Sequence, residues 1–137
     1  MKPKAIIVDI DGTLAKMSGR GPFEWHRVGE DKVNEPIKSI VNLYASICNV
    51  IIFSGRDGCC MPQTIKWLKD NDISYNSILM RPEGNYEKDA IIKRRLYDNH
   101  IVGKYDIQFV LDDRDQVVEM WRKDLGLTCL QVDYGNF

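Results

Sequence analysis

The sequence predicts an α/β fold: a single domain, residues 1–137, with a central five-stranded parallel sheet, helices on both faces and a minimal cap. Two observations predict it. Five short apolar runs recur along the chain, and stretches with the spacing of amphipathic helices separate them. Because right-handed crossovers join successive parallel strands, the carboxyl ends of the strands should meet at one edge of the sheet. The expected strands are residues 5–8, 50–53, 77–80, 108–111 and 128–132.

Carboxylates crowd the end of the first apolar run, which we expect to be the central strand. Residues 5–8 have no polar position, as in a parallel strand buried on both faces. Asp9 and Asp11 follow directly. Gly12 then permits a tight turn, and Thr13 adds a hydroxyl. Because Asp is depleted in strands and an unpaired buried charge is costly, the pair is easier to explain as a site than as scaffold.

Four helices are expected between the strands. Asn34 can cap the first, with Pro36 in its first turn, and Pro62 opens the second. Asn85 can cap the third, and the fourth starts near Asp115. The residues expected on their apolar sides are Ile37, Ile40, Val41 and Tyr44, then Ile65, Trp67 and Leu68, then Ile91, Ile92 and Leu96, and finally Val117, Val118, Met120 and Trp121.

The composition is typical of a globular protein without a membrane segment. The chain has 137 residues, of which 44% are hydrophobic and 28% charged. Its formal net charge is −1, so contacts with phosphates must come from a local patch rather than from overall basic charge. No apolar run approaches the roughly 20 residues that span a bilayer, and no signal-peptide pattern is present. We therefore expect a cytoplasmic protein with reduced cysteines and no membrane contact.

Three further polar groups follow the ends of later expected strands. They are Ser54-Gly55-Arg56, Lys88 and Asp112-Asp113-Arg114. Together with the first group they provide carboxylates, a hydroxyl, a lysine and arginines at one edge of the sheet, which is the set that phosphoryl transfer through an aspartyl-phosphate needs. Ser54 and Lys88 are expected to hold the non-bridging phosphate oxygens, and Lys88 also offsets the crowded negative charge.

The carboxylates divide the remaining chemistry among them. Asp9 is expected to attack phosphorus in line. Asp113 or Asp112 supplies a second acid for Mg²⁺, a hard cation that prefers oxygen ligands. Asp11 protonates the leaving oxygen and then takes a proton from the hydrolytic water.

Each group also has a plainer interpretation. The first motif and the Ser-Gly-Arg run could be ordinary turns, and Lys88 could be a solvated helix lysine. Asp112 and Asp113 could cap the following helix. The basic run at residues 93–95 could add a phosphate-binding patch, although it is more typical of a solvated helix face. All four groups in order, each after an expected strand, nevertheless favour phosphoryl transfer.

The four motifs resemble those of the haloacid dehalogenase (HAD) superfamily of phosphotransferases, with its Rossmann-like fold. Longer stretches, covering nearly the whole chain, are similar to the 3′-phosphatase domain of bacteriophage T4-type polynucleotide kinase/phosphatases. These stretches are residues 9–17, 19–22, 54–56, 112–114 and 116–122. The resemblance implies a Mg²⁺-dependent phosphatase that removes 3′-phosphates, and 2′,3′-cyclic phosphates, from DNA or RNA ends in nucleic-acid repair.

The resemblance also implies roles for single residues. Asp9 becomes the nucleophile and Asp11 the general acid and base. The protein ligands of Mg²⁺ become Asp9, the backbone carbonyl of Asp11, and Asp113. Arg20 and Arg56 match arginines needed for activity, which suit phosphate clamps because guanidinium binds in a bidentate fork.

The other expected site residues support this set. Asp89 would orient Lys88 or the network on the metal side. Thr13 and Gly55 are expected at the substrate, and Asp112 and Arg114 as supports.

No GxxxxGK[ST] run occurs in the sequence, which departs from the kinase-bearing members of that family. We therefore expect either a free-standing phosphatase or one whose kinase is a separate polypeptide. The expected partners are nucleic-acid 3′ ends, DNA or RNA, and a separate polynucleotide kinase or ligase.

Residues 14–32 form the one long irregular stretch, which we expect to be a small cap or lid. Its basic and aromatic residues could track a strand end and stack a terminal base, although nearby acids nearly cancel the charge. The plainer interpretation is aromatic packing on the domain. An open site favours a macromolecular end. The alternatives are a HAD phosphatase of small-molecule nucleotides or other phosphomonoesters, and a non-catalytic binding module.

Overall fold

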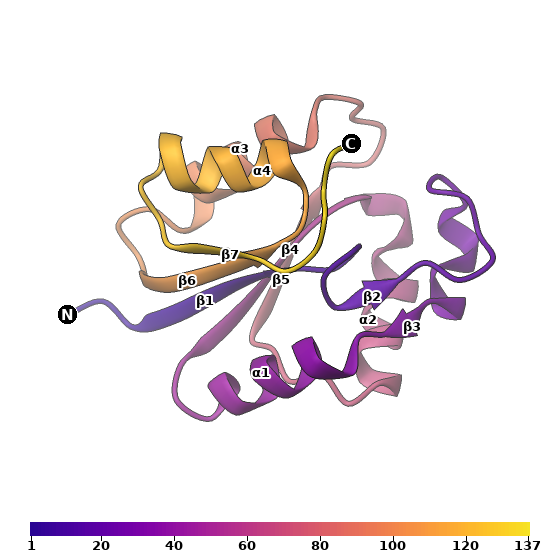
Figure 1. Cartoon of the computed structure of the whole chain (residues 1–137), viewed down its shortest axis with the longest axis horizontal. Coiled ribbons are helices and arrows are strands. Elements are labelled where there is room, and N and C mark those ends of the chain that lie inside the picture. The colour runs from indigo at the N-terminus through magenta and orange to yellow at the C-terminus, as the bar shows by residue number, and fades with distance from the viewer.

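The computed structural model describes all 137 residues and confirms the predicted α/β class (Figure 1). Strand β1 (Lys4–Asp9) lies at the centre of a five-stranded sheet of order β5-β4-β1-β6-β7, and every neighbouring pair is parallel. The other strands are β4 (Asn49–Asp57), β5 (Ser77–Arg81), β6 (Asp106–Asp112) and β7 (Cys129–Gln131). The central position of the first strand is therefore as predicted.

Helices cover both faces of this sheet (Figure 1). Helices α1 (Glu35–Ala45) and α2 (Met61–Asp70) lie on one face, and α3 (Asp89–His100) and α4 (Asp115–Glu119) on the other. A π-helical turn, Met120–Asp124, continues α4. None of the helices combines the length and apolar character that crossing a membrane requires.

The two faces of β1 build two separate cores. Ile6 and Val8 pack with residues of α1 and α2, whereas Ala5 and Ile7 pack with residues of α3 and α4. Successive side chains of a strand point to opposite faces, so a run with no polar position feeds both cores at once. Residue 9 therefore comes at the end of a fully buried strand.

The third helix begins later than predicted. The Asn85 side chain does not cap it, because its Oδ1 accepts a hydrogen bond from the backbone N–H of Glu87 at 2.8 Å and closes a local turn. Helix α3 starts at Asp89 instead. Ile92 and Lys93 are the buried residues of this helix, whereas Ile91, predicted on the apolar side, is 46% exposed.

Residues 14–32 hold little regular structure and lie at the edge of the sheet where the site forms. Strands β2 (Ala15–Lys16) and β3 (Lys32–Val33) pair in antiparallel fashion, and Trp25–Glu30 form a 3-10 helix. Val28 is fully buried against Cys60 and Met80, with Trp25 partly buried beside them, whereas Phe23 is 82% exposed. The aromatic packing anticipated for this segment is thus present at Trp25, and its role as a lid stays a prediction.

Candidate active site

Three strands deliver polar side chains to one edge of the sheet. Asp9 ends β1, and the pairing of Asp9 with Phe53 places Ser54 of β4 beside it. On the other side β1 pairs with β6, with Val8 opposite Leu111, so Asp112 at the end of β6 lies next to Asp9. Carboxyl ends of parallel strands are where ligands bind in open α/β sheets.

The structure brings Asp9, Asp112 and Asp113 together. Carboxylate oxygens of the three residues lie within 4.8 Å of one another, and all three residues are buried. Gly12 makes this approach possible: its φ is +84°, and a Cβ there would lie 2.1 Å from Oδ2 of Asp113. Only glycine suits both that backbone conformation and that contact.

Lys93 is the buried counter-charge of this cluster. Its Nζ lies 2.8 Å from Oδ1 of Asp9 and 3.0 Å from Oδ2 of Asp112, and the lysine is fully buried. A further carboxylate, Asp89, lies 3.6 Å from the same ammonium. A buried charge is tolerated when it is paired and hydrogen-bonded, and Lys93 satisfies both conditions.

The assignment of Lys88 to this position is corrected by the structure. Lys88 is an exposed residue at the N-cap of α3 and forms no hydrogen bond to the carboxylates. The helix pattern around Lys93 indicates a buried position, although the basic run of residues 93–95 is typical of a solvated face. Asp89, Ile92, Lys93 and Leu96 recur with the spacing of one helix face, and a lysine on such a face needs a buried partner.

Protonation reflects the crowding of these groups. Burial, together with repulsion from Asp112, raises the pKa of Asp9 well above its usual value, although Lys93 acts in the opposite direction. Burial likewise raises the pKa of Asp113 to about 6. Burial alone would lower the pKa of Lys93, but the attraction of Asp112, Asp89 and Asp9 outweighs it and keeps the lysine charged.

One ammonium does not balance three buried carboxylates. With Asp9, Asp112 and Asp113 ionised beside Lys93, two negative charges remain. An oxygen-only donor set of this charge fits a hard divalent cation such as Mg²⁺. Asp113 is the carboxylate best placed to bind such an ion, because both oxygens of Asp9 and both oxygens of Asp112 already accept hydrogen bonds.

Hydrogen bonds from neighbouring residues fix the orientation of the Asp112 and Asp9 carboxylates. Oδ2 of Asp112 accepts from Nε1 of Trp121 at 3.1 Å, in addition to Lys93, and its Oδ1 accepts from the backbone N–H of Asp113 at 2.9 Å. The Thr13 hydroxyl donates to Oδ2 of Asp9 at 3.0 Å and is fully buried. Thr13 therefore holds the carboxylate of Asp9, rather than lying open to a substrate.

Asp11 lies in a second, separate network of charges. Arg56 donates to both oxygens of Asp11, from Nη2 to Oδ1 at 2.8 Å and from Nε to Oδ2 at 3.0 Å. Arg20 adds a longer contact of 3.3 Å to Oδ1. The Asp11 side chain is thus turned toward the arginines and does not join the cluster of Asp9, and 30% of it remains accessible.

Asp31 binds both arginines, although no sequence motif predicted it as a residue of the site. Its Oδ1 accepts from Nε of Arg20 at 2.8 Å, and its Oδ2 accepts from both Arg20 and Arg56 at 2.9 Å. The side chains of all three residues are fully inaccessible to solvent. Arg20 and Arg56 therefore surround Asp11 with their guanidinium groups engaged, which differs from the open phosphate clamps expected of them.

The remaining predicted residues lie around this centre. Ser54 is buried and its hydroxyl accepts from the backbone N–H of Arg56 at 3.1 Å. A Cβ at Gly55 would lie 1.9 Å from Oδ1 of Asp89, so this glycine lets α3 approach β4 closely. Arg114 is directed away, donating to the carbonyl of Phe137 at 2.9 Å and lying over its ring.

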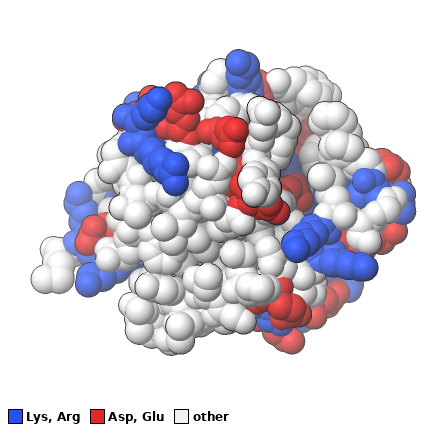
Figure 2. Space-filling view, in the orientation of Figure 1, with Lys and Arg blue, Asp and Glu red and all other residues white.

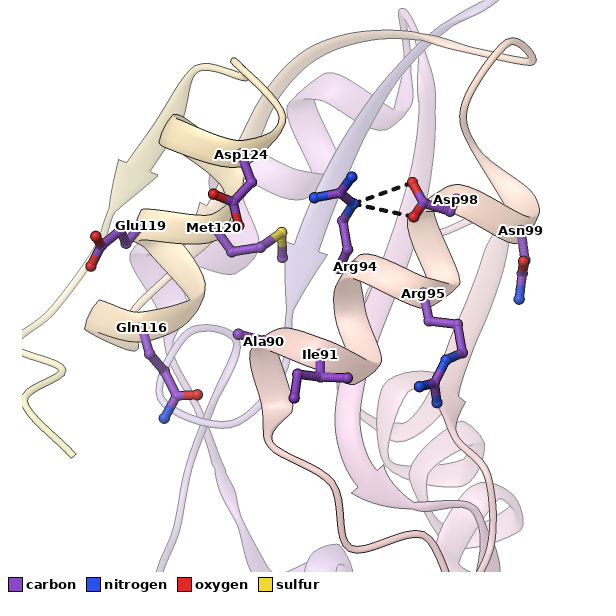
Figure 3. Close-up of a pocket in the computed structure, with 10 residues that line it drawn as sticks. All are labelled: Ala90, Ile91, Arg94, Arg95, Asp98, Asn99, Gln116, Glu119, Met120 and Asp124. Carbon is purple, nitrogen blue, oxygen red and sulfur yellow. Dashed lines mark hydrogen bonds and ion pairs between the residues drawn. The ribbon is translucent and has the colours of Figure 1, made fainter.

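A cavity elsewhere on the protein does not hold this chemistry. A cavity of about 520 Å³ lies between α3 and the end of α4 (Figure 3). Its basic residues have partners: Arg94 is hydrogen-bonded to Asp98 at 3.1 Å, and Arg95 to Glu87 at 2.7 Å. No carboxylate of the cluster lines it, so we place the active site at the sheet edge.

The parallel sheet with buried carboxylates and a buried lysine at its carboxyl edge belongs to a phosphatase domain of the HAD superfamily. The chain belongs to the polynucleotide kinase PNKP phosphatase domain family, which matches residues 3–137. That match confirms the resemblance stated from the motifs.

Individual relatives agree with this family. A putative bifunctional polynucleotide kinase/RNA ligase of Autographa californica nuclear polyhedrosis virus is 36% identical over 124 residues, which are 88% of this chain and 18% of that protein. Chains in two solved structures, of the Pnkp1/Rnl/Hen1 complex and of the Pnkp1/Rnl/Hen1 RNA repair complex, each superpose with a TM-score of 0.97 at 42% identity. Both matches cover 99% of this chain and less than half of the neighbour, 48% and 44%.

Replacing the buried lysine should destabilise the fold far more than replacing the exposed one. Lys93→Gln should lower the free energy of unfolding by about 3–5 kcal/mol, because it leaves buried carboxylates without their counter-charge. Lys88→Gln should change it by less than about 0.5 kcal/mol. Urea unfolding of both variants without divalent cations measures the difference, and equal losses would contradict the placement of Lys93.

The arginine network should depend on Asp31. Asp31→Asn should lower the free energy of unfolding by about 3–5 kcal/mol, since two buried guanidinium groups lose their shared partner. The matched change Asp98→Asn removes the exposed partner of Arg94 and should cost at most about 1 kcal/mol. Guanidinium unfolding curves of the two variants compare them, and a loss at Asp31 as small as that at Asp98 would rule out this role.

Proposed function

We propose that the protein removes 3′-phosphates from nucleic-acid ends, DNA or RNA, through an aspartyl-phosphate formed on Asp9. The observation that carries the proposal is the separation of two aspartates into different environments. Asp9 lies in the cluster with Lys93 and Asp113, whereas Asp11, two residues later, is held by Arg20 and Arg56. Two carboxylates with different surroundings suit two different roles.

The reaction follows from those positions. An oxygen of Asp9 attacks phosphorus in line, the bond between phosphorus and the leaving 3′-oxygen breaks, and Asp11 gives its proton to that oxygen. Water then attacks the phosphorus of the aspartyl-phosphate, Asp11 takes the proton, and inorganic phosphate leaves with Asp9 restored. Thr13 and Lys93 hold the attacking carboxylate in place throughout.

Mg²⁺ is the proposed cofactor. Asp9, Asp113 and the backbone carbonyl of Asp11 would hold it, and the bound ion would neutralise charge on the transferring phosphoryl group. The excess negative charge of the buried cluster supports this assignment. Ser54 is proposed to hold a phosphate oxygen together with the Lys93 ammonium, the role that the motifs predicted for Lys88.

The biological setting is proposed from the relatives. One is described as a putative polynucleotide kinase/RNA ligase, and two chains belong to complexes that carry Pnkp1, Rnl and Hen1. We therefore propose that the phosphatase acts in nucleic-acid end repair beside a polynucleotide kinase and a ligase. Ends that carry 2′,3′-cyclic phosphate are proposed as a further substrate.

A comparison of three substrates tests the activity. Phosphate release should be fastest from an oligonucleotide with a 3′-phosphate, slower from a nucleoside 3′-monophosphate, and slowest from an aryl phosphate. Asp9→Asn should reduce turnover below about a thousandth, because the nucleophile is lost. His26→Ala, at an exposed position in residues 14–32, should retain most activity. Equal rates on all substrates would favour a small-molecule phosphatase, and release from none would favour a binding module.

Metal binding has a readout that does not require turnover. Saturating Mg²⁺ should raise the thermal midpoint of the protein by about 5–10 °C, because the ion binds the native cluster and not the unfolded chain. Asp113→Asn should abolish most of that rise. Asp106→Asn, at the opposite end of β6, should leave it intact. Differential scanning fluorimetry measures all of these, and an unchanged rise in Asp113→Asn would exclude Asp113 as a ligand.

A further inference from the structure

Two lysines lie directly opposite each other on the short strand pair of residues 14–32. Lys16 of β2 pairs with Lys32 of β3, and both side chains are exposed. Neither takes part in any of the ion pairs of the protein. Like charges directly opposite on an antiparallel pair are destabilising, so this arrangement does not serve the fold itself.

The other basic residues of the same segment are already neutralised. Arg20 is buried in the network of Asp31, and Arg27 is bound to Glu30 at 2.9 Å with Glu24 at 3.5 Å. Although the net charge of residues 14–32 is near zero, Lys16 and Lys32 therefore carry positive charge that no acidic side chain neutralises. Figure 2 shows Lys and Arg side chains projecting together over β2 and β3, beside a hollow that separates this lobe from the C-terminal tail.

The lysine pair is attached to the catalytic turn. The backbone of Ala15 bridges to Asp11, and the Gly12 N–H donates to the Ala15 carbonyl at 2.8 Å. Lys16 follows Ala15 by one residue, which in a strand is about 3.3 Å. The two exposed lysines therefore extend from backbone that lies within one residue of the segment bridged to Asp11.

That side is where the body of the substrate must lie. In the proposed reaction Asp11 protonates the leaving oxygen, which belongs to the nucleotide and not to the transferred phosphoryl group. In this proposal the rest of the nucleic-acid chain extends past Asp11, toward the β2–β3 pair. Lysine ammonium groups attract phosphodiester oxygens without reading the base, which suits an enzyme that meets ends of any sequence.

We propose that Lys16 and Lys32 bind the phosphodiester backbone of the strand next to its 3′-terminal nucleotide. This assignment rests on the proposed 3′-phosphatase function and adds a site for the polymeric part of the substrate. It makes the enzyme prefer an oligonucleotide to a mononucleotide, because only the oligonucleotide carries a phosphodiester for the lysines.

The kinetic test uses two substrates and two matched double variants. Lys16→Gln/Lys32→Gln should lower the ratio of kcat/KM for a 3′-phosphorylated RNA oligonucleotide to that for a nucleoside 3′-monophosphate by about tenfold. The control Lys69→Gln/Lys104→Gln removes the same charge from exposed lysines away from the site, near the opposite edge of the sheet, and should keep the ratio within about twofold.

A binding test does not depend on catalysis. Fluorescence anisotropy with an RNA oligonucleotide that ends in a 3′-hydroxyl measures affinity as salt is raised. The slope of log affinity against log salt should become shallower by about 1.4 in the Lys16→Gln/Lys32→Gln variant, for two phosphate contacts on a single strand. The control variant should keep the wild-type slope.

The outcomes separate this assignment from the function on which it rests. Wild-type turnover of both substrates with an unchanged ratio and slope in the Lys16→Gln/Lys32→Gln variant overturns the lysine site alone. Equal effects in the control variant also overturn it, because the contribution would then be one of overall charge. Phosphate release from neither substrate by the wild-type protein overturns both.

Discussion

The contact between Lys93 and the carboxylates of Asp9 and Asp112 is the interaction on which the rest of the site depends. It joins α3 to the ends of β1 and β6, so the elements that meet at the sheet edge are held there by charge as well as by packing. Without it, three buried carboxylates would repel one another. With it, the ionised cluster still carries a negative excess, which suits a site that binds a divalent cation.

A second charge network gives Asp11 surroundings that differ from those of Asp9. Asp9 and Asp11 are two residues apart, yet one faces a lysine and the other two arginines. Asp31 closes this network from a segment that the sequence marks only as irregular. The Trp67 indole donates to the Asp31 carbonyl at 2.8 Å, which fastens the segment to α2. Residues 14–32 thus contribute to the site by fixing the orientation of the Asp11 side chain, in addition to lying at its rim.

Much of the fold and of the centre could be predicted from the chain. Apolar runs indicated the strands, because burial on both faces leaves no room for polar residues. The polar groups after those runs indicated the edge where they meet. Which lysine pairs with the buried carboxylates could not be predicted in the same way. Lys88 and Lys93 both follow β5, yet Lys88 is exposed at the N-cap of α3 whereas Lys93 lies inside the helix and is buried against Asp9 and Asp112.

The sequence by itself determined the class of the protein, the order of its elements and the carboxylates that surround Asp9, because local patterns and motifs encode these directly. Only the tertiary structure decided that Lys93 is the buried cation, that Arg20 and Arg56 bind both Asp11 and Asp31, and that Lys16 lies opposite Lys32. Each of these is a contact between residues far apart in the chain. Such contacts depend on the approach of whole elements, and charge selects among partners only once packing has brought them within reach.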